Sequence, residues 1–314
     1  MTGPLGSVPA NVHIASMSAP LVFDRPLARR RLARAQASGF ADFLLARAAD
    51  DMEDRLAAVL RNFPLALDVG TPTPLMTERL RTSGRADAVL RLAPTLEPGA
   101  LTVVADEEAL PAAPGAFALA VSLLALQGVN DLPGCLFQIR RALKPDGFFL
   151  ACLFGGATLT ELRQSFTQAE AELEGGVSPR VAPFAEVRDL GALLQRAGFA
   201  LPVTDVDSVV VRYADPLGLF RDLRGMGLTS ALLERRRTPL RRATLLRALQ
   251  IYAERFADPD GRVRATFEMI WLSGWAPHES QQQPLRPGSA KARLADALKV
   301  MEHGPGGPME PGER

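Results

Sequence analysis

The chain has 314 residues, 47% of them hydrophobic, and a formal net charge of +1. This length suits one large or two small domains with a sizeable core, and the near-neutral charge gives no reason to expect nucleic acid or an anionic membrane as a partner. Cys135 and Cys152 lack metal-ligand spacing and the three histidines are scattered, so we expect no metal site and a reducing compartment.

The first quarter of the chain begins with a segment of biased composition, and helical patterns follow it. Residues 1–22 are rich in Ala, Ser, Gly and Pro, which is typical of disorder, and show no signal-peptide pattern. Residues 23–36 carry four arginines after Pro26, at positions 29, 30, 31 and 34. We expect a solvated helix face there, with a lid helix over a pocket as the alternative. Residues 40–60 have the spacing of an amphipathic helix.

Strand and helix patterns then alternate. Apolar runs predict five strands, at residues 65–69, 88–92, 101–104, 117–126 and 148–154. Helical spacing predicts helices at 75–81 and 132–143, and Lys-Pro-Asp-Gly predicts a turn at 144–147. The alternation indicates an α/β fold with a Rossmann-like, open, mostly parallel sheet. Right-handed crossovers would place the strand ends, and hence a pocket, on one side.

The second half predicts helices at 158–173 and 187–197, then late strands at 203–213 and 266–275. Between the late strands, residues 217–256 are arginine-rich and have helical spacing. We therefore expect an antiparallel late strand pair with a helical cap insertion at residues 214–261. Residues 284–314 are rich in Pro, Gly and charge, which indicates a flexible tail and leaves 23–283 as the main domain. No apolar run is long enough to span a bilayer.

An acid and a glycine follow the first confident strand, at Asp68 and Gly70. A strand that ends this way and feeds a helix is how open α/β sheets build a nucleotide pocket. Pro72 and Pro74 stand in the turn, where further glycines are expected. Proline removes backbone donors that a ligand would use.

Several other residues have a structural interpretation. We expect Trp271 and Trp275 in the core, and Cys135 and Cys152 as small buried apolar residues. Asn130 and Asp131 either face the pocket or cap the next helix, with capping favoured. For His278 beside Glu279, we prefer a hydrogen bond that anchors the tail over acid–base catalysis.

Four short motifs occur at the expected strand ends. They are Leu-Asp-Val-Gly at 67–70, Ala-Asp-Glu at 105–107, Asn-Asp-Leu-Pro at 130–133 and Leu-Lys-Pro-Asp-Gly at 143–147. Their order resembles that of class I S-adenosylmethionine-dependent methyltransferases. The resemblance implies S-adenosylmethionine as cofactor, Asp68 and Gly70 at its methionine end, Asp106 and Glu107 at its adenine, and Leu126 in the pocket. Helix capping is the alternative for each of the acids.

A longer set of matches covers residues 23–298. It includes Phe-Asp-Arg at 23–25, Arg-Asn-Phe-Pro at 61–64, Ala-Asp-Glu-Glu at 105–108, Val-Asn-Asp-Leu-Pro at 129–133, Phe-Gly-Gly at 154–156, Gly-Met-Gly at 225–227 and His-Glu-Ser-Gln at 278–281. This set resembles the methyltransferase-like assembly factors of respiratory complex I, a group close to the malonyl-carrier methyltransferases of biotin synthesis. The resemblance implies a role in complex I maturation and, in the mitochondrial relative, hydroxylation of an arginine in a complex I subunit.

The sequence departs from this family in three places, all on the cofactor side. The turn after Gly70 reads Thr-Pro-Thr-Pro, residues 91–94 read Arg-Leu-Ala-Pro where the family has an acid for the ribose, and Gln127-Gly128 replaces a His-Trp pair. Our leading interpretation is a methyltransferase-family protein that assembles or modifies a complex I subunit by methylation or arginine hydroxylation. The alternatives are a pseudo-methyltransferase binding module and a methyltransferase for a small-molecule or carrier-bound acid.

The remaining expectations follow from the same interpretation. No catalytic residue is assigned, because methyl transfer depends mainly on alignment of the donor and the nucleophile. We expect a cytoplasmic protein, with attachment to the periphery of the inner membrane through its partner as an open alternative.

Overall fold

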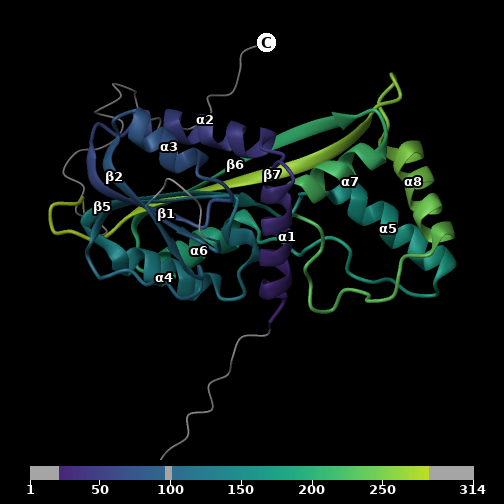
Figure 1. Cartoon of the computed structure of the whole chain (residues 1–314), viewed down its shortest axis with the longest axis horizontal. Coiled ribbons are helices and arrows are strands. Elements are labelled where there is room, and N and C mark those ends of the chain that lie inside the picture. Colours follow the sequence, from purple (N-terminus) through teal and green to yellow (C-terminus); the bar gives the residue numbers. More distant parts are fainter. Residues whose placement is uncertain (1–20, 96–100, 283–314) are drawn as a thin grey trace, which may run out of the picture. The chain divides into compact units, whose positions relative to one another are not determined.

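The computed structural model describes residues 21–95 and 101–282, which contain seven strands. They are β1 (Phe63–Val69), β2 (Ala86–Ala93), β3 (Thr102–Val104), β4 (Phe117–Leu123), β5 (Leu143–Phe154), β6 (Ala200–Tyr213) and β7 (Val263–Trp275). They form one sheet in the order β3-β2-β1-β4-β5-β7-β6 (Figure 1). The chain divides into a unit that ends at Pro277 and a second unit from His278 onward, and the sheet belongs to the first.

The sheet is parallel from β3 to β5 and antiparallel after that. β1 pairs in parallel with β2 and β4, and β4 pairs in parallel with β5. β7 runs antiparallel to both β5 and β6, so β6 forms the edge. The last seven residues of β5 are buried without alternation, as expected of a strand covered on both faces. The predicted mostly parallel sheet with an antiparallel late pair is confirmed.

Helices cover both faces of the sheet. They are α1 (Arg25–Ala37), α2 (Phe43–Ala57), α3 (Leu75–Thr82), α4 (Leu132–Ala142), α5 (Thr160–Leu173), α6 (Val187–Arg196), α7 (Pro216–Gly225) and α8 (Arg242–Phe256). In Figure 1, α2 and α3 lie on one face, and α4 and α6 lie on the other. Each face has its own apolar core: one includes Leu44 and Leu45 of α2, and the other includes Leu136 and Leu190.

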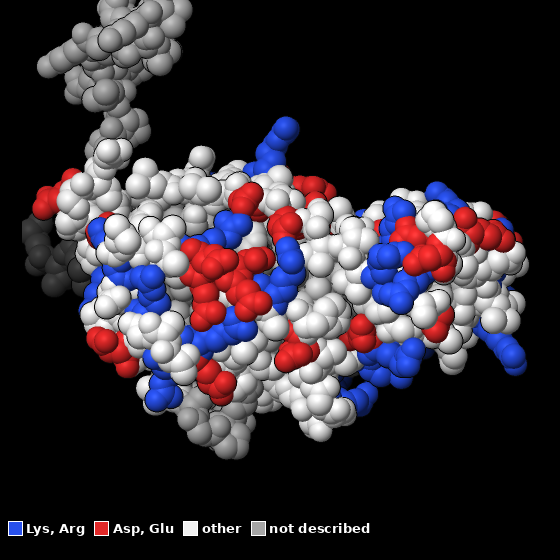
Figure 2. Space-filling view, turned by 90° about the horizontal axis from the view of Figure 1, so that it is seen from above, with Lys and Arg blue, Asp and Glu red and all other residues white. Residues whose placement is uncertain are grey.

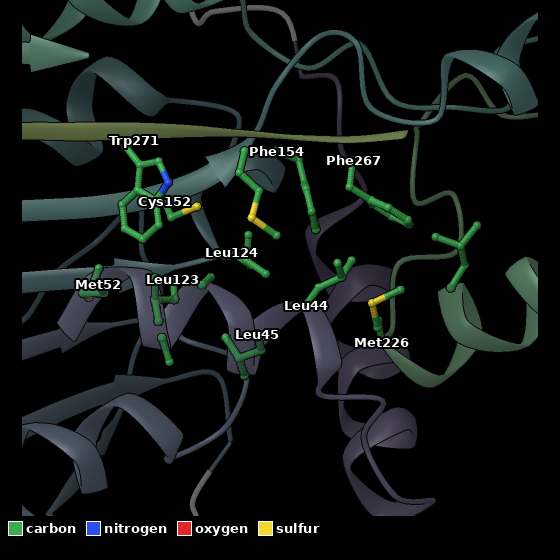
Figure 3. Close-up of a cluster of buried hydrophobic side chains, with 14 of the residues drawn as sticks. Leu44, Leu45, Met52, Leu123, Leu124, Cys152, Phe154, Met226, Phe267 and Trp271 are labelled. Atoms are coloured by element: carbon green, nitrogen blue, oxygen red, sulfur yellow. The ribbon is translucent and has the colours of Figure 1, made fainter. Parts of the chain in front are cut away.

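The first core extends from the sheet towards the late insertion. Figure 3 shows Leu44 of α2 beside Met226, with Phe154 and Phe267 next to them. Trp271 is buried in the same core, as predicted, and Trp275 packs against it while partly exposed. Cys135 and Cys152 are fully buried, and burial raises the pKa of both thiols, so they behave as small apolar residues.

Two predicted boundaries in the middle of the chain are wrong. Residues 144–147 were expected to form a turn, but they belong to β5, because Asp146 and Gly147 exchange backbone hydrogen bonds with Ala276 just beyond β7. The Lys-Pro-Asp-Gly signal instead marks an irregularity, with Asp146 at φ 60°. The strand expected over residues 117–126 ends at Leu123, because Leu124 takes a left-handed conformation and Leu126–Gly128 form a 3-10 helix.

The cap, residues 214–261, is only partly helical. Helical spacing predicts one continuous pattern across 217–256, but residues 226–241 separate α7 from α8 without an α-helix. Gly227 explains part of the break: its φ is +73°, and a Cβ there would lie 2.9 Å from Cα of Leu32 in α1. Close packing of the two backbones therefore requires glycine at this position. The proposed disordered extension and tail lie outside the described residues, apart from residues 21–22.

Charged side chains on the face that carries α2 are of both signs and lie next to one another (Figure 2). Their ion pairs link α2 to α3 and to β6: Arg79 with Asp50 and Glu53, Arg47 with Asp51 and Asp207, and Arg55 with Asp205. Because these charges neutralise one another, this face presents no continuous basic surface for nucleic acid.

Candidate functional site

The strand order reverses between β1 and β4, which is where open α/β sheets bind their ligands. Asp68 and Gly70 lie at the carboxyl end of β1, and Asp106 follows β3. The predicted cofactor residues therefore share one edge of the sheet. Their side chains, however, already have partners within the chain.

Asp68 is fully buried and its carboxylate is saturated. It accepts hydrogen bonds from the hydroxyls of Thr71 and Thr77, the second at 2.7 Å. Its Oδ2 also lies 3.2 Å from Nη1 of Arg91, which is equally buried. The carboxylate of Asp68 thus has three partners within the chain, and its expected contact with a cofactor stays a prediction.

Arg91 reaches Asp68 because the two residues face each other in the parallel register of β1 and β2. Its second terminal nitrogen donates to the carbonyl of Thr71 at 2.7 Å, so the guanidinium fastens the turn as well as the carboxylate. A cation thus lies near the end of β2, where a ribose-binding acid is expected in such folds.

Glu107 covers Gly70. A Cβ built on Gly70 would lie 2.7 Å from Oε1 of Glu107 and 2.9 Å from its Cγ, and the glycine has φ +72°. Glycine is therefore required here by the protein's own side chain as well as by the turn. The side chain of Glu107 therefore lies over this backbone.

Arg25 and Arg29 of α1 bind the acids that follow β3. Arg25 contacts both Asp106 and Glu107, the first at 3.0 Å, and Arg29 also pairs with Asp106. Burial alone would raise the pKa of Asp106, but the Glu108 backbone N–H and the two arginines outweigh it and lower that pKa to about 2. These ion pairs therefore hold α1 against the acids that follow β3, and its role as a lid over a pocket stays a prediction.

Little space remains beside the turn. Gln36 of α1 donates from its side-chain amide to the carbonyl of Pro72 at 2.6 Å. A cavity next to Pro72, bounded also by Phe40, Leu124 and Met226, has a volume of about 20 Å³. This is room for about one water molecule, far below the several hundred Å³ of a typical ligand pocket.

The other predicted residues have structural roles. Leu126 is buried in the core shared with α4 and α6, where it packs among apolar side chains. Asp131 caps α4 by accepting from the backbone N–H of Gly134 at 2.8 Å, which confirms the capping prediction. Oδ1 of Asn130 accepts from the backbone N–H groups of Val22 and Phe23, so it ties down the segment before α1.

A larger cavity, about 340 Å³, lies on the other side of Phe154. We call it the cap-side cavity. Six phenylalanines line it, together with leucines and residues of the cap: Phe23, Phe154, Phe166, Phe184, Phe220 and Phe267, with Leu159, Leu162, Leu223, Leu228 and the segment 227–231. Leu159 holds a left-handed conformation, φ 56°, through a backbone hydrogen bond to Thr266. A non-glycine residue in this conformation is strained and tends to mark a functional site.

Sequence reasoning missed the residues that fill the cofactor side. Arg91 was noted as a replacement for an acid, but its pairing with Asp68 was not predicted. Their facing positions on adjacent parallel strands are the signal that points to it. His278 accepts a hydrogen bond from Ser280 and lies beside its hydroxyl within its own turn. In the described ranges no cluster of His, Cys, Asp and Glu could hold a metal ion, and no helix there is long and apolar enough to cross a membrane.

Comparison with known proteins places these features in context. Residues 67–151 match a family described as a methyltransferase domain. The chain is 41% identical over 290 residues to the arginine hydroxylase NDUFAF5, mitochondrial, of Danio rerio, covering 89% of this chain and 90% of that protein. The human protein of the same name is 40% identical over 290 residues, covering 89% and 84%.

More distant similarity covers part of the chain. The malonyl-[acyl-carrier protein] O-methyltransferase of Xylella fastidiosa is 37% identical over 175 residues, 56% of this chain and 57% of that protein. A solved structure from Bacillus halodurans, provisionally assigned as a methyltransferase, superposes with a TM-score of 0.50 at 13% identity, over 73% of this chain and all of that one. The latter supports the fold alone.

Proposed function

The chain belongs to the family of the NDUFAF5 arginine hydroxylases, and from this premise we propose that it is an assembly factor for a respiratory complex I subunit that works without S-adenosylmethionine. It keeps the methyltransferase fold as a scaffold. The partner subunit is engaged on the side of the cap, and the cofactor side is closed by the protein itself.

The observation that carries the proposal is the buried Arg91–Asp68 ion pair. S-adenosylmethionine carries a cationic sulfonium, which a free carboxylate would attract. The carboxylate of Asp68 is already neutralised by the fully buried guanidinium of Arg91. Removing one member of such a pair to admit a ligand would leave an uncompensated buried charge, at a cost of several kcal/mol. The residues present therefore do not fit the cofactor.

Three further contacts support the same conclusion. Glu107 covers Gly70, Arg25 holds Glu107 and Asp106, and Gln36 occupies the carbonyl of Pro72. Each contact uses a polar atom of the cofactor-side turn or of the acids beside it. A methyltransferase for a small-molecule or carrier-bound acid needs the methyl donor, so these contacts disfavour that alternative equally.

The partner and its modification come from the relatives. Their name, arginine hydroxylase, indicates an arginine as the group acted on in those proteins. We propose that this chain meets an arginine-bearing segment of a complex I subunit, with the cap near residues 225–227 contributing to selection of the partner. Gly227 lines the cap-side cavity, and Met226 packs against the core.

Genetic complementation tests this function. In a strain lacking the chain, we expect fully assembled complex I, measured on native gels, to fall and to return when the wild-type chain is supplied. Assembled complex I that is unchanged by the loss of the chain would contradict the proposed role.

A matched pair of variants locates the working side. Gly227→Val should fail to restore assembly, because its Cβ would meet the backbone of Leu32 and displace the cap from α1. Gly39→Ala, at a glycine with positive φ but open space, is the control and should restore it. Rescue by both variants to the same level would remove the cap from the proposal.

A further inference from the structure

The cap-side cavity is surrounded by positive charge as well as apolar side chains. Its lining includes Arg180 and Arg224 and no acidic residue. Arg180 is paired with Glu170 through its Nε, at 2.8 Å. Arg224 is exposed and makes no ion pair within the part of the chain that the structure describes.

Two further arginines stand directly behind the cavity wall. Arg31 of α1 donates to the carbonyls of Thr229 and Ser230, and both of these residues line the cavity. Arg163 of α5 donates to the carbonyls of Thr158 and Ala182, at 3.4 and 3.5 Å, and these also line it. Neither arginine has a carboxylate partner within residues 21–95 and 101–282.

The protein compensates only part of the charge at this wall: Glu170 pairs with Arg180, and the negative charge of Asp24 acts on Arg31. Burial lowers the pKa of Arg31, and the nearby charge of Arg235 lowers it further. Unpaired cations beside a low-dielectric space favour an anion there, since buried charges are normally paired. The buried hydroxyl of Ser230 has no hydrogen-bond partner among the described residues, so it has a donor to offer to such a ligand.

We propose that the cap-side cavity binds an apolar molecule with a single carboxylate head. The six phenylalanines and four leucines hold the aliphatic or aromatic body. The head lies near Ser230 and Arg224, with Arg31 behind the wall. A volume of about 340 Å³ suits one small ligand. The cavity reaches Gln127 and Gly128 on the cofactor side, but Asp68, Gly70, Asp106 and Glu107 are not part of its lining. The inference holds whether or not the assembly role does.

Three ligands of equal length test the head group on the full chain: octanoate, 1-octanol and octylammonium, followed by isothermal titration. We expect octanoate to bind about tenfold more tightly than octanol, and octylammonium to bind weakest. Equal affinity for octanoate and octylammonium, or no binding of octanoate at millimolar concentration, would overturn the proposal.

Variants then place the ligand. Arg224→Ala should weaken octanoate about fivefold and leave octanol unchanged, whereas Arg221→Ala, also exposed on α7 but outside the lining, should change neither. Ala182→Phe fills the cavity and should abolish binding of octanoate and octanol. If that variant loses its thermal transition, Ala231→Phe serves instead, and the three-ligand series on the wild type decides in any case. Unchanged octanoate binding in a folded cavity-filling variant would contradict the assignment.

Discussion

The two sides of Phe154 differ in what fills them. On the side of Gly70, every acid expected to meet a cofactor is bound to an arginine of the same chain, and about 20 Å³ remains beside the turn. On the side of the cap, about 340 Å³ of apolar space is lined by Arg180, which pairs with Glu170, and by Arg224, which makes no ion pair among the described residues. Acids and arginines are thus matched where little space remains, whereas the lining of the larger cavity contains arginines and no acid.

The largest expected effect concerns the charge pair that closes the first side. Arg91→Met leaves Asp68 buried without its cation, so the free energy of unfolding in urea at pH 7 should fall by about 3–5 kcal/mol. Adding Asp68→Asn should restore at least half of the loss, because the uncompensated charge disappears. A single variant as stable as the wild type would mean that the pair does not hold this side together.

The next largest effect on the free energy of unfolding comes from the packing of Glu107 over Gly70. In Gly70→Ala, the alanine is destabilised by the left-handed backbone conformation and by a clash with Glu107. In Gly84→Ala, at φ +67° with nothing within 4 Å, it is destabilised by the backbone conformation alone. The difference in unfolding free energy between the two variants should be about 1–3 kcal/mol. In a Glu107→Ala background most of that difference should disappear, because only the contact with Cβ of Ala125, at 3.1 Å, remains. A difference that is undiminished in this background would show that Glu107 is not the main cause of the clash.

Asp106 should make a smaller contribution, which appears in how the free energy of unfolding changes at acidic pH. Its pKa is lowered to about 2, below the unfolded value of about 3.9. Its stabilising contribution is therefore present above pH 4 and is lost as pH falls towards 2. The stability difference between wild type and Asp106→Asn should shrink over this window. A difference that stays constant between pH 5 and pH 2 would contradict the contacts of Arg25 and Arg29.

The smallest effect concerns the arginines at 235–237. Arg235 pairs with Asp24, and Arg236 pairs with Glu174, so reversing the charge of all three would disturb structure as well as surface. Arg237 is exposed and has no ion pair within the described residues, so Arg237→Glu alone probes the surface. We expect no change in melting temperature and a modest, salt-sensitive loss of partner binding. Partner binding that is unchanged at low salt would leave Arg237 without a role.

Sequence patterns predicted most of the sheet and little of the site, for a physical reason. A strand such as β4 can be recognised from its local sequence, because consecutive apolar residues are buried together. The contact of Arg25 with Glu107 spans 82 positions and depends on where α1 lies over the sheet. The break in the cap was missed because the residues around Gly227 keep helical apolar spacing, while the chain there packs on the backbone of Leu32.

Asp131 and Arg91 show the same difference between a local contact, which the sequence predicts, and a long-range contact, which it does not. Asp131 was predicted as a cap because its partner, the N–H of Gly134, lies three residues away. Arg91 pairs with Asp68, 23 positions away, and only the register of β1 and β2 brings them together. The replacement of an acid by Arg91 was visible in the sequence, but its consequence depended on that register.

Titration of the full-length wild-type chain with S-adenosylmethionine, and separately with S-adenosylhomocysteine, tests the central claim most directly. The closed cofactor side predicts no measurable heat of binding for either compound up to millimolar concentration. Binding in the low micromolar range, about −8 kcal/mol, would contradict the account, which proposes that the contacts of Arg91, Glu107 and Arg25 exclude both compounds.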